Sequence, residues 1–221
     1  MSSPAPYIDH TLLDLAAAPA QIVQLCQEAQ AMEFAAVCIY PKFLDVAYQC
    51  QQSFKPAHFK LAAVIDFPQG TSPAADRIRM AQEAVQAHAQ ELDVVLNREW
   101  LRQKDYPAIL QELRIMQALA PVKLILESSL LTYPEKITIM ALAMAVPIMM
   151  AKTSTGVYGK ATLEDVALLA ALAGGKIGIK ASGGIRTLDQ AQAMLKAGAT
   201  RLGTSHALAI MAEWQAQNKT P

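Results

Sequence analysis

The sequence has few cysteines, no excess of either charge and no long apolar run. Its three cysteines, at positions 26, 38 and 50, form no C-x-x-C pair and no Cys/His spacing typical of a metal site. Lys and Arg together number 19, as do Asp and Glu, and this balance gives no sign of a nucleic-acid partner. We therefore expect reduced thiols, no metal and no nucleic acid.

No segment has the pattern of a membrane span or a secretion signal. The most apolar stretch, residues 137–150, is too short to cross a bilayer and is interrupted by Pro147. The first seven residues lack a basic segment followed by an apolar stretch, so no signal peptide is expected. These features predict a cytoplasmic protein that does not bind a membrane.

Apolar residues are abundant, at 53% of the 221 residues, which is ample for a large core. No linker or low-complexity tract divides the chain, so we expect one domain over residues 1–221. Short apolar runs typical of strands in a parallel sheet alternate with helical patterns. The expected strands are 7–10, 35–40, 60–67, 92–97, 122–128, 148–153, 176–181 and 201–204.

Helices are expected between these strands, including a short and then a longer one within residues 98–120. Thr187 and Gln190 form a capping-box pattern, and Gly198 can end the helix that follows. Eight strand–helix units predict an α/β fold, a single-domain (β/α)8 TIM barrel. A doubly wound open sheet is the alternative, but its phosphate-binding glycine signature is absent after the early strands.

Two lysines occupy matching places in successive strand-to-loop units. Lys152 precedes Thr-Ser-Thr-Gly, and Lys180 precedes Ala-Ser-Gly-Gly. If their strands are parallel neighbours, both amines point into one site, where their charges repel and one gives up its proton more easily. A neutral lysine amine is a nucleophile toward carbonyl groups. The pattern therefore predicts Lys152 as the nucleophile and Lys180 as its neighbouring charge.

An aspartate in an apolar strand completes the expected catalytic group. Asp93 has apolar neighbours on both sides, and buried aspartates are uncommon unless they are paired or used. We expect Asp93 to carry protons for the lysines. The alternative is a salt bridge with one lysine that only fills the barrel. Asp9, in the first strand, is expected only to hold the first loop.

Glycines follow the sixth, seventh and eighth expected strands. Barrel enzymes often bind phosphate at the last two of these loops, through backbone N–H groups and a helix N-terminus. Tight turns are the alternative reason for such glycines. The expected phosphate and substrate contacts are Gly156, Gly183, Gly184, Gly203 and Ser205, with Thr153 and Cys38 as further candidates at strand ends.

These motifs resemble the 2-deoxyribose-5-phosphate aldolase family. The matching segments are residues 8–13, 37–41, 67–70, 92–97, 127–132, 152–156, 180–187 and 203–205. The resemblance implies a (β/α)8 barrel and a class I aldolase without metal or organic cofactor. Such an enzyme cleaves 2-deoxy-D-ribose 5-phosphate reversibly into acetaldehyde and D-glyceraldehyde 3-phosphate, through a Schiff base that maps onto Lys152. It also implies a role in deoxyribonucleotide catabolism, and a homodimer is a candidate assembly.

Three residues depart from the usual family pattern: Asp66 stands where glycine is usual, Ala151 where the side chain is often bulkier, and His206 where a second small residue is common. We expect His206 either to add a phosphate donor or to narrow the pocket. Two other functions stay open, a Schiff-base aldolase or transaldolase-like enzyme with another donor, and a barrel that only binds sugar phosphate. Lys152→Arg distinguishes the barrel that only binds sugar phosphate from the two enzymes, because arginine keeps the charge but cannot form an imine.

Overall fold

The computed structural model describes residues 3–218, and the domain expected over residues 1–221 extends past this range at both ends. The described residues form a closed barrel of parallel strands in which each strand pairs with the next and β8 pairs with β1. The strands are β1 (Ile8–Leu12), β2 (Ala36–Ile39), β3 (Lys60–Ile65), β4 (Glu91–Val95), β5 (Val122–Ile125), β6 (Met150–Lys152), β7 (Gly178–Ser182) and β8 (Arg201–Thr204). The (β/α)8 barrel predicted from the sequence is confirmed.

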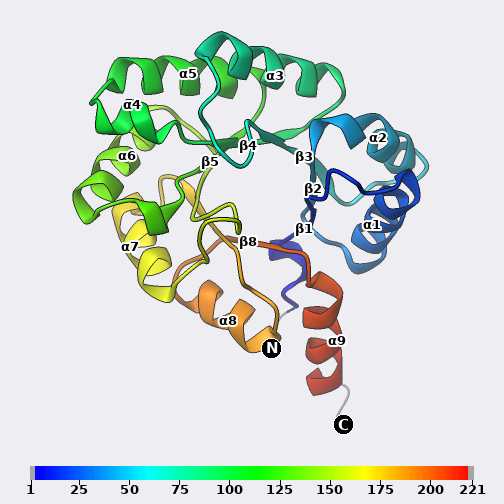
Figure 1. Ribbon diagram of the computed structural model, residues 1–221. Helices are drawn as coiled ribbons and strands as arrows, with labels where there is room; N and C mark the ends of the chain where they lie inside the picture. Colours follow the sequence, from blue (N-terminus) through cyan, green and yellow to red (C-terminus); the bar gives the residue numbers. More distant parts are fainter. Residues whose placement is uncertain (1–2, 219–221) are drawn as a thin grey trace.

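Helices surround the strands in Figure 1. They are α1 (Pro19–Met32), α2 (Leu44–Gln52), α3 (Ala74–Gln86), α4 (Arg98–Arg102), α5 (Tyr106–Leu119), α6 (Tyr133–Ala145), α7 (Leu163–Ala173), α8 (Leu188–Lys196) and α9 (Ala207–Asn218). The expected pair of helices within 98–120 is present as α4 and α5. The capping box of Thr187 and Gln190 begins α8, and Gly198, at φ +110°, follows its end.

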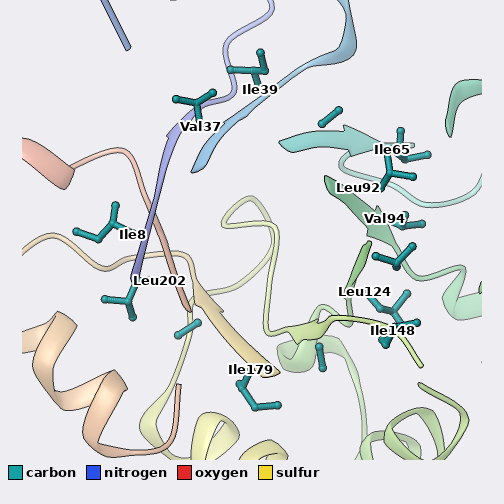
Figure 2. Packing of buried hydrophobic residues seen from close by; sticks show 14 of the residues in the cluster. Ile8, Val37, Ile39, Ile65, Leu92, Val94, Leu124, Ile148, Ile179 and Leu202 are labelled. Atoms are coloured by element: carbon teal, nitrogen blue, oxygen red, sulfur yellow. The ribbon is translucent and has the colours of Figure 1, made fainter. Parts of the chain in front are cut away.

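Alternate strand residues point outward and build the hydrophobic core beneath the helices (Figure 2). Val37, Ile39, Leu92 and Val94 are fully buried there. Burial of one such side chain contributes about 1.5–3 kcal/mol to folding, so this outer layer is a main source of the barrel's stability.

The inward-pointing residues divide the barrel interior into two parts. β2 and β3 contribute a small apolar cluster of Ala36, Cys38, Ala62 and Val64. The other strands contribute charged side chains, described below. Burying an unpaired charge costs much free energy, so each charged side chain in this part of the barrel needs a partner of opposite charge at a fixed position.

Most strands differ from the sequence expectation at one or both ends, and three of these differences have a clear local cause. β1 begins at Ile8 because Ala5–Tyr7 forms a 3-10 turn after Pro4. β3 stops before Asp66, and β5 stops two residues before Glu127, because these two residues take left-handed backbone angles, with φ of +52° and +55°. An extended strand cannot continue through such angles.

Candidate active site

Seven charged side chains from six strands meet inside the barrel, and none is more than 15% exposed. They comprise three carboxylates and four cations: Asp9 on β1, Glu91 and Asp93 on β4, Lys123 on β5, Lys152 on β6, Lys180 on β7 and Arg201 on β8. Desolvation of each charge is offset by its partners, so the amines and carboxylates hold one another in place.

Asp93 lies at the centre of the group. Its Oδ2 atom accepts hydrogen bonds from Lys152 Nζ and from Lys180 Nζ, both at 2.8 Å. Its Oδ1 atom lies 3.1 Å from Lys123 Nζ. Burial alone would raise the pKa of Asp93, but the three lysines outweigh burial and hold the pKa well below its usual value. The carboxylate is therefore ionised at neutral pH.

Lys152 and Lys180 are register partners on adjacent strands, which puts them at one level of the barrel. Lys180 is fully buried and also donates to Asp9 Oδ2 at 2.5 Å. Burial lowers the pKa of Lys180, whereas Asp9 and Asp93 raise it, and the net effect is a pKa above the usual value. Lys180 is thus held as an ammonium ion. Lys152 is 3% exposed and lines a cavity.

Sequence reasoning missed the deeper half of the cluster. Lys123 Nζ lies 2.8 Å from Asp9 Oδ2 and 2.5 Å from Glu91 Oε2, and Arg201 lies 2.7 Å from Asp9 Oδ1. The carboxylate of Asp9 is therefore part of the barrel interior, and its expected role in the first loop is wrong. Burial raises the pKa of Asp9, but Lys123, Lys180 and Arg201 lower it by more. A lysine within the run Val122-Lys-Leu-Ile125 was the available signal.

A cavity of about 470 Å³ opens above the cluster, a size that suits a small metabolite. Lys152 lies in its wall. Thr11, Leu12, Tyr40 and Phe67 line one part, from the loops and strand ends of the N-terminal half. The loops after β6, β7 and β8 line another part.

These three loops carry the expected phosphate residues, and Gly156, Gly183, Gly184, Gly203 and Ser205 all line the cavity. The first three have left-handed backbone angles, with φ of +84°, +94° and +79°. A Cβ atom on Gly183 would come within 2.9 Å of the Gly159 carbonyl oxygen, so the loops after β6 and β7 touch there. The glycines allow this contact and leave their backbone accessible to a ligand.

The two further candidates lie behind the cavity wall. Thr153 is fully buried, and its hydroxyl accepts from Ser182 N at 3.0 Å and contacts Ser182 O at 3.2 Å, so it joins β6 to β7. Cys38 is fully buried, with Sγ 3.7 Å from Asp93 Oδ2. Burial and then Asp93 raise the pKa of the Cys38 thiol. Their contact with substrate stays a prediction.

Two of the unusual residues have clear surroundings. The Asp66 carboxylate accepts from Ser72 N at 2.9 Å and from the buried Arg77 guanidinium at 2.6 Å, which fixes the loop that carries Phe67 to the cavity. His206 lines the cavity immediately before α9, with Nδ1 3.1 Å from Ser205 Oγ. Ala151 is buried in the outer core.

Within residues 3–218, no cluster of three or more His, Cys, Asp or Glu side chains is arranged to hold a metal ion. Over the same range, no helix combines the length and apolar character needed to cross a membrane.

Comparison with known proteins gives a consistent family. The chain is 44% identical over 209 residues to deoxyribose-phosphate aldolase from Cyanothece sp., covering 94% of this chain and 90% of the relative. It is 43% identical to the same enzyme of Thermosynechococcus vestitus, covering 94% and 95%. The solved tetrameric deoxyribose phosphate aldolase of Aeropyrum pernix superposes with a TM-score of 0.89, at 31% identity, covering 97% of this chain and 93% of that one. No protein-family model matches the chain.

Proposed function

The chain belongs to the deoxyribose-phosphate aldolase family and is therefore a lyase, and we propose that it cleaves 2-deoxy-D-ribose 5-phosphate through a Schiff base on Lys152. The products are acetaldehyde and D-glyceraldehyde 3-phosphate, and the reaction is reversible. We further propose a role in the breakdown of deoxyribonucleotides. Class I chemistry of this kind uses a lysine amine to activate the carbonyl group.

The observation that carries the choice of nucleophile is the different exposure of the three clustered lysines. Lys123 and Lys180 are fully buried, whereas Lys152 lines the cavity. A substrate carbonyl carbon that enters the cavity can therefore approach Lys152 Nζ directly. The two other lysines would require the barrel wall to open. This difference favours Lys152 as the residue that forms the covalent bond.

Attack on the C1 aldehyde requires the neutral amine of Lys152, and Asp93 Oδ2 at 2.8 Å is in reach to accept its proton. The three lysines around Asp93 hold its pKa down. Once Lys152 is neutral, one of those three positive charges is gone, so the pKa of Asp93 rises and the carboxyl group can hold this proton. The amine adds to C1, Asp93 returns its proton to the C1 oxygen as that oxygen leaves as water, and the iminium ion forms with Asp93 ionised again.

The iminium ion then acts as the electron sink for bond cleavage. The C3 hydroxyl gives up its proton to Asp93, directly or through water, and the C2–C3 bond breaks with its electrons moving toward the iminium nitrogen. D-Glyceraldehyde 3-phosphate leaves, and an enamine remains on Lys152. Protonation of the enamine at C2 and hydrolysis by water release acetaldehyde and restore the amine. Lys180 stays an ammonium throughout and balances the negative charge of Asp93.

The phosphate group is proposed to bind at the glycine loops across the cavity. Backbone N–H groups of Gly183 and Gly184 and the N-terminal end of α9 beside Ser205 are suited to an anion. Binding of C5 phosphate there would hold the open-chain sugar with its aldehyde toward Lys152. The distance between the two ends of the substrate would then be set by the barrel.

The test is to incubate the protein with 2-deoxyribose 5-phosphate, reduce with borohydride and locate the adduct by mass spectrometry. An adduct on Lys152 that is absent from Lys152→Arg is the expected result. Lys180→Arg, the same substitution at the register partner, is the matched control for general damage to the cluster.

The outcomes separate the remaining functions. An adduct on Lys180 or Lys123 would contradict the assignment of the nucleophile. Turnover of another donor without adduct formation from deoxyribose phosphate would indicate a related Schiff-base enzyme. Substrate binding that survives in Lys152→Arg, with no turnover and no adduct in the wild type, would indicate a barrel that only binds sugar phosphate.

A further inference from the structure

Ser182, the last residue of β7, carries a hydroxyl group that makes no hydrogen bond within the described part of the chain. Ser182 is 4% exposed and lines the cavity, and its Oγ atom is buried without a hydrogen-bond partner among residues 3–218. A buried hydroxyl that makes no hydrogen bond lowers stability, and alanine would avoid that cost. A cavity-facing group of this kind is suited to a ligand.

The backbone of Ser182 is held firmly on both sides. Its N–H donates to Thr153 Oγ1 at 3.0 Å, and its carbonyl oxygen accepts from Ser154 Oγ at 3.0 Å. The side chain is therefore attached to a fixed point of the sheet. A fixed hydrogen-bonding group loses little freedom when a ligand binds, which suits it for recognition.

Gly203 leaves the room that this hydroxyl occupies. It is the register partner of Ser182 on β8, and a Cβ atom built on Gly203 would lie 2.3 Å from Ser182 Oγ and 3.0 Å from Lys180 Cε. Any larger residue at position 203 would force the Ser182 side chain to move. The hydroxyl is thus placed between the buried lysine and the glycine loops.

We infer that Ser182 Oγ binds the C4 hydroxyl of the sugar phosphate and so determines the specificity of the enzyme at that carbon. This inference rests on the proposed function. With C1 on Lys152 and the C5 phosphate at the glycine loops, the hydroxyl next to the phosphate end is that of C4. Ser182 directly precedes Gly183 and touches the space above Gly203, which is the phosphate end of the cavity.

C4 is also the stereocentre that distinguishes D- from L-glyceraldehyde 3-phosphate in the condensation direction. A site built to bind a hydroxyl group rejects a substrate that lacks it more strongly than an apolar site can, because its own polar group is then left unpaired. Ser182 would therefore favour acceptors with a hydroxyl in the D configuration.

The experiment compares Ser182→Ala with the wild type in the condensation of acetaldehyde with two acceptors. One acceptor is D-glyceraldehyde 3-phosphate, and the other is 3-phosphooxypropanal, which lacks the hydroxyl that becomes C4–OH. We expect kcat/KM for the first to fall about tenfold and that for the second to stay within about twofold, as for loss of one hydrogen bond. With L-glyceraldehyde 3-phosphate as a third acceptor, the ratio of kcat/KM for the D form to kcat/KM for the L form should also fall in Ser182→Ala.

Ser128→Ala is the matched control. Ser128 Oγ is also buried without a partner in the described part of the chain, at 1% residue exposure, but Ser128 does not line the cavity. Its substitution should change neither acceptor. Both variants should keep the melting temperature of the wild type or exceed it, because each loses an unpaired buried hydroxyl.

An equal loss with both acceptors, or no loss with either, would overturn the inference and leave the aldolase function intact. A wild-type protein that condenses neither acceptor with acetaldehyde would overturn the proposed function and this inference with it.

Discussion

Lys152 Nζ and Lys180 Nζ lie at the same distance, 2.8 Å, from one oxygen atom of Asp93. The two lysines are register partners, but their surroundings differ. Lys180 has a second carboxylate, Asp9, and is fully buried, whereas Lys152 meets the cavity. One carboxylate oxygen of Asp93 thus binds both an amine that lines the cavity and an ammonium that is buried behind it. The proposed division of roles between the two lysines rests on this asymmetry.

Asp93→Asn is expected to reduce kcat for cleavage by about 10²–10⁴, the usual range for loss of a proton-transfer group. It should also destabilise the fold by about 3–5 kcal/mol, because it removes a buried charge that three lysines share. Steady-state kinetics and urea unfolding measure the two effects.

Asp165→Asn is the matched control for Asp93→Asn. Asp165 is also largely buried and paired, with Lys136 Nζ at 2.5 Å, but it lies on α7 outside the cavity. The Asp165→Asn variant should be less stable than the wild type, without a comparable loss of kcat. Near-normal kcat in Asp93→Asn would show that Asp93 serves only the barrel's stability.

The fold could be predicted from the sequence because most strands are short apolar runs and helical patterns lie between them. The exceptions are instructive. β3 and β5 end early because Asp66 and Glu127 take left-handed backbone angles. The Asp66 side chain binds Arg77 in α3, and the Glu127 side chain binds Thr155 in the loop after β6. An apolar pattern carries no information about such contacts.

Only the part of the candidate site nearest the cavity could be predicted from the sequence. Lys152 and Lys180 stood out because each ends an apolar run, and Asp93 stood out because it is a charge inside one. Lys123 and Arg201 did not, because their importance depends on which strands lie opposite in the closed barrel. The closure of eight strands, with Asp9 facing Lys123, is a tertiary fact that no local pattern expresses.

Glu127→Gln is expected to raise KM for 2-deoxyribose 5-phosphate about tenfold, with kcat changed less. The buried Glu127 carboxylate accepts from Thr155 N at 3.0 Å and from Thr155 Oγ1 at 2.5 Å, and Thr155 Oγ1 accepts from Val157 N at 3.1 Å. These bonds fix the loop around Gly156 in the cavity wall. Charge-assisted bonds of this kind contribute about 1.5–3 kcal/mol, so a neutral amide should loosen the loop.

Glu135→Gln provides a close control. The Glu135 carboxylate also accepts from the backbone N–H and the hydroxyl of one threonine, Thr132, but it does so at the exposed start of α6. Its substitution should leave KM unchanged. A larger change in kcat than in KM for Glu127→Gln would indicate a chemical role instead of loop positioning.

His206→Ser tests the unusual residue beside the proposed phosphate site. The His206 ring contacts Ser205 Oγ through Nδ1, which leaves Nε2 for a second partner. We expect KM for deoxyribose 5-phosphate to rise about tenfold relative to KM for unphosphorylated deoxyribose, because a hydrogen bond to a charged group is lost. His58→Ser is the control at an exposed position away from the cavity. An unchanged ratio would exclude both a donor role and a narrowing role for His206.

His10 should give the protein a stability that falls on mild acidification. The ring is buried on the outer side of β1, with Nε2 2.7 Å from Glu28 Oε2. Burial lowers the pKa of His10 below 6.5, and Glu28 offsets only part of that effect. As the pH falls through 6.5, the unfolded chain therefore binds this proton more readily than the folded chain does, and unfolding becomes more favourable.

In His10→Gln the side-chain amide can still donate to Glu28 but does not titrate, so this part of the pH dependence should disappear. Urea unfolding at pH 7.5 and pH 5.5 measures it, and the free energy of unfolding of the wild type should fall more between the two than that of His10→Gln. His58→Gln, the same change at an exposed histidine, should behave as the wild type does. Equal falls in all three proteins would mean that His10 takes up its proton as readily in the folded chain as in the unfolded one, contrary to the effect of its burial.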